Sequence, residues 1–93
     1  MDLHIKDVLK NYIKKDKVVG DAYYTQKIRD YWKNNLAESI TSRTHSLLYS
    51  KGKLTIKTYS APLRNELFNS REQIRSKINV YLKDEIVNLI ILR

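Results

Sequence analysis

The residues of this chain that are best suited to binding chemistry are lysines and tyrosines gathered around one short segment. Lys51, Lys53 and Lys57 lie close together, and Tyr49 and Tyr59 flank them. Lysine ammonium groups neutralise phosphates and release counterions, while tyrosine rings can stack on unpaired bases. The pattern predicts a site for an anionic partner such as nucleic acid. The alternative is an exposed sheet face on which lysines discourage aggregation and the tyrosines are half-buried.

A row of arginines follows at helical spacing. If residues 61–83 form one helix, then Arg64, Arg71 and Arg75 fall within about 40° of one another, beside an apolar stripe. Such a row suits contact with phosphates or with an acidic helix. The alternative is that the arginine stems cover the edge of the core while their charged heads stay in water.

The chain lacks the residue patterns that usually support catalysis or metal binding. The chain has no cysteine, which excludes disulfides and thiolate metal sites. His4 and His45 have no acidic companions at ligand spacing, and the adjacent Asp84 and Glu85 have the pattern of exposed loop residues. No phosphate-binding loop, activated nucleophile or zinc motif is present. We therefore expect a protein that is not an enzyme and has no cofactor and no small-molecule substrate.

The positive charge is unevenly distributed. The 93 residues carry a net charge of +8, and residues 40–83 hold nine Lys or Arg against two Asp or Glu. This length predicts a single domain over residues 1–93. The N-terminal sequence MDLHIKDVLK interrupts each apolar run with a charge, and no run is long enough to span a bilayer. We expect a cytoplasmic protein with no signal peptide and no membrane contact.

The elements that would position these residues follow from apolar periodicity. The expected order begins with a helix over 2–16, a connection over 14–20 and a second helix from Asp21 to about residue 42, which could break at Asn34 and Asn35. Strands over 44–50 and 53–59 follow. A long helix over 61–83, capped by Ser60, then leads to a strand over 86–92. A crossover helix places the last strand parallel to the second. The fold class is therefore α+β, with a small three-stranded mixed sheet and helices packed on one face.

The apolar positions of these elements predict the core. Its expected members are Leu54, Ile56, Leu63, Leu67, Ile74, Ile78, Leu89 and Ile91. Trp32 is the single tryptophan and lies in the apolar stripe of the second helix, which favours a core position. The alternative is a partner-binding role for Trp32.

The segment from Trp32 to Arg93 carries a family pattern. A Trp is followed by an apolar helix, a Gly-turned hairpin, a Ser-started helix and an apolar final strand. The residues that occupy the pattern's positions are Gly52, Leu54, Ile56, Ser60, Glu66, Leu67, Ile74, Ile78 and Asn79. Over about residues 21–93 the chain resembles the DciA-like family of small bacterial proteins. It departs from the family in having Leu36 and Ala37 where most members have a glycine.

The resemblance implies a KH-like fold and a role in loading or operating the DnaB-type replicative helicase in DNA replication. It also implies contacts with DNA and with that helicase. The usual KH clamp uses a GxxG loop, which is absent, so side chains would have to bind the nucleic acid. We expect a non-catalytic, nucleoid-associated adaptor that binds single-stranded or forked DNA. The alternatives are a protein-interaction module without direct DNA binding and a KH-like RNA-binding domain.

Overall fold

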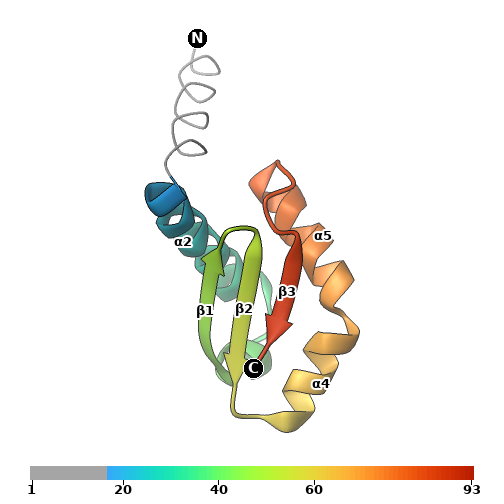
Figure 1. Cartoon of the computed structure of the whole chain (residues 1–93). Coiled ribbons are helices and arrows are strands. Elements are labelled where there is room, and N and C mark those ends of the chain that lie inside the picture. Colours follow the sequence, from blue (N-terminus) through green and yellow to red (C-terminus); the bar gives the residue numbers. More distant parts are fainter. Residues whose placement is uncertain (1–16) are drawn as a thin grey trace.

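The computed structural model describes residues 17–93, which form a three-stranded sheet covered by helices (Figure 1). The elements are α2 (Lys17–Asn35), α3 (Glu38–Thr41), β1 (Thr44–Ser50), β2 (Lys53–Thr58), α4 (Ala61–Asn69), α5 (Arg71–Leu82) and β3 (Leu89–Leu92). The helix expected over 2–16 lies outside the described residues. The α+β class and the mixed sheet are confirmed.

The sheet has the order β1-β2-β3, with β1 antiparallel and β3 parallel to the central strand β2. In Figure 1, α2 passes behind the sheet, and α4 and α5 lie along the β3 side. One face of the sheet packs on this helical layer. The buried apolar residues are Tyr24, Ile28, Trp32, Leu47, Tyr49, Leu54, Ile56, Leu63, Leu67, Ile78, Ile86, Val87 and Ile90.

Helix α2 begins earlier than expected, because residues 17–20 are helical rather than part of a connection. Asp21 is therefore not an N-cap. Its carboxylate accepts hydrogen bonds from the Ser50 hydroxyl at 3.2 Å and the Lys51 N–H at 3.4 Å. These contacts with the hairpin occupy the acceptor that a cap would use. The helix ends at Asn35, so the expected break at the two asparagines is confirmed.

The outer edge of β1 is closed by side chains of α2. The Thr25 hydroxyl donates to the carbonyl of Tyr49 and accepts from the Tyr49 N–H, at 3.1 and 3.0 Å. Arg29 Nε donates to the carbonyl of Leu47 at 3.2 Å. These bonds use backbone groups that would otherwise be free to pair with another strand.

The helix expected over 61–83 is broken at Ser70. Ser60 caps α4, as predicted, by accepting a hydrogen bond from the Leu63 N–H. Ser70 then ends α4 and starts α5, with φ −103° and ψ 10°. Asn69 and Ser70 are poor helix formers, and the change of direction lets Leu67 and Ile78 both reach the core.

The last strand is shorter than expected, and its sides are reversed. It pairs with β2 only from Leu89, because the buried backbone of Ile86 and Val87 bonds instead to the side chain of Asn79. Ile90, which pairs with Leu54, faces the core. Leu89 is 48% exposed, so the prediction that it lies in the core is wrong. Ile91 is on the same side of the sheet as Leu89 and is only partly buried.

Candidate nucleic-acid interface

The hairpin turn holds Lys51 at the tip of the sheet. Lys51 and Gly52 both have positive φ, at 51° and 83°, as the favoured two-residue hairpin turns require. A Cβ on Gly52 would lie 2.6 Å from Asn88 Nδ2. The turn thus combines a left-handed conformation with a close approach to the chain entering β3, and glycine meets both demands.

The face of the sheet that none of the described helices covers carries three rows of side chains, and we call it the open face. Alternation and strand register give one row of Ser46, Lys57 and Arg93, a middle row of Leu48, Thr55 and Ile91, and a third row of Ser50, Lys53 and Leu89. Lys53, Lys57 and Arg93 are exposed. No Asp or Glu is a member of these rows, so the open face is uniformly cationic.

An aromatic corner adjoins the Lys57 end of the open face. The rings of His45 and Tyr59 lie 4.7 Å apart, and Lys57 Nζ lies 5.6 Å from the Tyr59 ring. Tyr59 is 74% exposed. Its ring is therefore available to a ligand beside a cation.

Tyr49 does not lie on the surface, so its expected place in the binding set is wrong. Its hydroxyl donates to the carbonyl of Ile86 and accepts from the N–H of Gly52, both at 3.1 Å. Burial raises the pKa of Tyr49, because desolvation disfavours the phenolate; the Gly52 N–H opposes this shift and the Asp21 carboxylate adds to it. Tyr49 positions the hairpin and cannot stack on bases from this place.

The three arginines do not form one row, because the break at Ser70 puts Arg64 on α4 and the other two on α5. Arg64 Nη2 donates to the carbonyl of Thr58 at 2.7 Å, close to Tyr59 in the chain. Arg71 donates to the carbonyl of Phe68 and lies 4.0 Å from its ring. All three guanidinium groups make local contacts, and none belongs to the open face.

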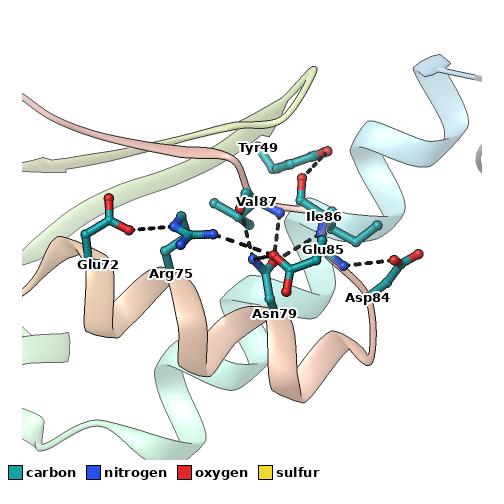
Figure 2. Close-up of polar contacts among 8 residues, drawn as sticks. All are labelled: Tyr49, Glu72, Arg75, Asn79, Asp84, Glu85, Ile86 and Val87. Carbon is teal, nitrogen blue, oxygen red and sulfur yellow. Dashed lines mark hydrogen bonds and ion pairs between the residues drawn. The ribbon is translucent and has the colours of Figure 1, made fainter.

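Arg75 belongs to a polar cluster under the loop that leads into β3 (Figure 2). It pairs with Glu72 at 2.8 Å and with Glu85 at 3.6 Å. Asn79 Oδ1 accepts from the N–H groups of Ile86 and Val87 at 3.1 and 2.8 Å, and Asn79 Nδ2 donates to the Val87 carbonyl at 2.9 Å. The sequence analysis assigned Asn79 no role, although an asparagine beside Ile78 on an apolar stripe is a signal of a buried polar contact.

Trp32 lies in the core, with 3% of its surface exposed. Its Nε1–H donates to the Thr44 hydroxyl at 3.0 Å, and that hydroxyl donates to the carbonyl of Ile40. The favoured core position is confirmed. The indole fixes the connection between α3 and β1.

Four charged or apolar members of the open face are missing from the site expected from the sequence. Arg93 was not considered, and Leu48 was not assigned to a side of its strand. Leu89 and Ile91 were placed in the core. Alternation in β1 was a usable signal, because the buried residues Leu47 and Tyr49 leave Leu48 on the other side, where it is 57% exposed.

Within residues 17–93, no group of three or more potential metal ligands is present. None of the helices described is long and apolar enough to cross a membrane.

Comparison with known proteins gives the family. Searches of curated proteins and of solved structures found no match. The family described as "Dna[CI] antecedent, DciA" matches residues 4–92, which is nearly the whole chain. This family acts with the DnaB-type replicative helicase as its loader or operator. The chain therefore belongs to the DciA family.

Proposed function

We propose that this protein is a non-catalytic adaptor that binds DNA while it assists loading or operation of the replicative helicase. The observation that carries the DNA half is the open face, where Lys53, Lys57 and Arg93 are exposed and no Asp or Glu is a member of the three rows. The helicase half rests on membership of the DciA family. We place this activity at the nucleoid in the bacterial cytoplasm.

The positions of the cations suit contacts with phosphates rather than recognition of a base sequence. Lys51 at the hairpin tip extends the series of Lys53 and Lys57 along the sheet. Phosphate contacts orient a nucleic acid without reading its sequence. We expect DNA binding without strong base preference.

Single-stranded or forked DNA is the proposed form of the ligand. A base can stack on an aromatic ring only when it is free of its complementary strand. Tyr59 offers an exposed ring beside Lys57, and Arg64 lies at the start of the helix that follows. Arg71 and Arg75 would contribute through the longer-range field rather than through the open face.

The test compares two variants with equal net charge. Lys53→Glu with Lys57→Glu alters the open face, and Lys33→Glu with Lys77→Glu alters exposed positions of the helical layer. Fluorescence anisotropy of a labelled single-stranded oligonucleotide is measured across a salt series. We expect the first variant alone to lose affinity strongly, with a salt slope smaller by about one unit per lost phosphate contact.

Equal losses in the two variants would show that total charge, and not the open face, determines binding. Unchanged affinity in a folded Lys53→Glu, Lys57→Glu variant would refute the DNA site. The helicase half is tested separately by purifying the protein from its host after nuclease treatment. Loss of the hexameric helicase from the purified material would contradict a direct contact.

A further inference from the structure

The open face has an apolar strip that phosphate binding does not require. Leu48 is 57% exposed and shares the middle row with the partly exposed Ile91, and Leu89, which is 48% exposed, lies next to Ile91 in the Lys53 row. Through the register, Leu48 pairs with Thr55 and Thr55 with Ile91, so the strip crosses all three strands. Exposed apolar side chains that adjoin one another in this way are typical of a surface that binds a protein.

The cations are arranged on both sides of the middle row of the open face. Lys53 and Lys57 are four residues apart on β2, which is about 13 Å at the usual rise per residue. Thr55 and the middle row lie midway between them, whereas Leu89 lies in the Lys53 row. An α-helix with its side chains is about 10–12 Å across. A helix laid along the strip would therefore have one lysine on each flank.

We propose that the open face binds an amphipathic α-helix of a partner protein, with an apolar stripe bordered on both sides by acidic residues. The stripe packs on Leu48, Leu89 and Ile91, and the acidic borders meet Lys53 on one side and Lys57 with Arg93 on the other. The same lysines serve the DNA site, so helix and DNA bind in turn and not together. This competition rests on the proposed DNA binding, whereas the docking of the helix does not.

Two other occupants fit the strip less well. Unpaired bases stack best on aromatic rings, and the strip is aliphatic, since Tyr59 lies at the end of the Lys57 row. A second copy of this chain would bring the same cations face to face, and like charges repel. Apolar contact bordered by opposite charge is the combination that matches all three rows.

The test uses a labelled synthetic peptide as the probe, with Leu at positions i, i+3, i+4 and i+7 and Glu on both borders of that stripe. A shuffled peptide of the same composition lacks the stripe, and a third peptide has Lys in place of Glu. Fluorescence anisotropy measures binding to the full chain. We expect the striped acidic peptide to bind at least about tenfold more tightly than either control. Equal binding of the shuffled peptide would reduce the interaction to general charge attraction and overturn the proposal.

Three variants, each checked for folding by circular dichroism, then separate the strip from the cations. Leu48→Thr with Leu89→Thr removes the strip but keeps strand-forming residues, and Val80→Thr removes an apolar residue that is 74% exposed on α5. We expect the strip variant to lose about tenfold in peptide affinity with DNA affinity unchanged. Val80→Thr should change neither affinity, and Lys53→Glu with Lys57→Glu should lower both.

The outcomes distinguish the two proposals. A strip variant that binds the peptide like wild type overturns the helix site. One that loses DNA affinity to the same extent also overturns it, because the strip would then be a platform for bases. If Lys53→Glu with Lys57→Glu loses the peptide but keeps DNA, the helix site stands and the DNA proposal fails. Unlabelled oligonucleotide should displace the bound peptide, and a ternary complex would overturn the competition.

Discussion

The hydroxyl of Tyr49 and the carbonyl of Ile86, 37 residues apart in the chain, are joined by a hydrogen bond of 3.1 Å. The same hydroxyl accepts the N–H of Gly52. One side chain therefore connects the cationic hairpin to the segment that enters β3. This buried phenol helps to hold the cationic hairpin in place, although its ring lies in the core and not on the open face.

The stability of the protein should fall at high pH through Tyr49. Its pKa is raised in the folded state, so the phenol keeps its proton there after the unfolded chain has lost it. This contribution is complete below the unfolded pKa of about 10 and is lost as pH rises through the folded pKa. Urea unfolding should show a steeper loss above pH 10 for wild type than for Tyr49→Phe. Identical pH profiles would contradict the coupling. Near pH 7, Tyr49→Phe should cost at least about 2 kcal/mol, because the Gly52 N–H and the Ile86 carbonyl each lose this partner at about 1–3 kcal/mol per buried group.

Replacing Asn79 with alanine should destabilise the loop before β3. The change removes the partner of both the Val87 N–H and the Val87 carbonyl, whereas the Ile86 N–H keeps its bond to the Asp84 carbonyl. Each buried group left unsatisfied costs about 1–3 kcal/mol, so a loss of at least about 2 kcal/mol is expected in urea unfolding. The control is Asn65→Ala on an exposed position of α4, which should change stability little. Equal effects of the two alanines would show that Asn79 is not a structural clamp.

Two leucines expected together in the core should behave differently. Leu67 is 4% exposed, and Leu67→Ala should cost about 2–5 kcal/mol through lost burial and a cavity. Leu89 lies on the open face, so Leu89→Ala should cost less than about 1 kcal/mol. Chemical denaturation of both variants provides the comparison. A large loss for Leu89→Ala would mean that β3 has the opposite face toward the helices.

Tyr59 should contribute to binding of single strands without contributing to stability. Its ring is exposed and lies beside Lys57, so Tyr59→Ala removes a stacking surface and no core contact. We expect affinity for a single-stranded oligonucleotide to fall by about 1–3 kcal/mol, with duplex affinity nearly unchanged. Anisotropy with both forms measures this. Parallel losses for single strand and duplex would indicate a phosphate contact instead of stacking.

The parts of the fold that the sequence predicts are those with local signals. Gly52 marks the hairpin, Ser60 marks the start of α4, and alternation in β2 separates Leu54 and Ile56 from the lysines. The parallel position of β3 follows from the helical crossover.

Other features depend on tertiary contacts that no local pattern reveals. The run from Leu89 to Leu92 is apolar at each position. The sequence therefore does not show which of these side chains face the core unless the register of the strand against β2 is known. The break at Ser70 follows from the need to bring two helical segments onto one core. Tyrosine and arginine are typical of binding surfaces, yet the hydrogen-bond partners of Tyr49 and Arg64 are backbone groups of this chain. The proposed site therefore rests on the lysines and Tyr59, while Tyr49 and Arg64 bond to the backbone of the fold.

The central strand of the sheet pairs with neighbours made at different times during translation. β1 precedes β2 directly, so the hairpin can close on a nascent chain as soon as residue 58 has left the ribosome. The other side of β2 stays an unpaired edge until residues 89–92 emerge, and Tyr49 lacks its Ile86 partner until then. During that interval the sheet is incomplete, and β3 and α5 do not yet cover Leu54 and Ile56. The anchor that orients the cationic hairpin is thus completed only after α5 and β3 have been made, and a ribosome stalled within α5 would hold the hairpin without it.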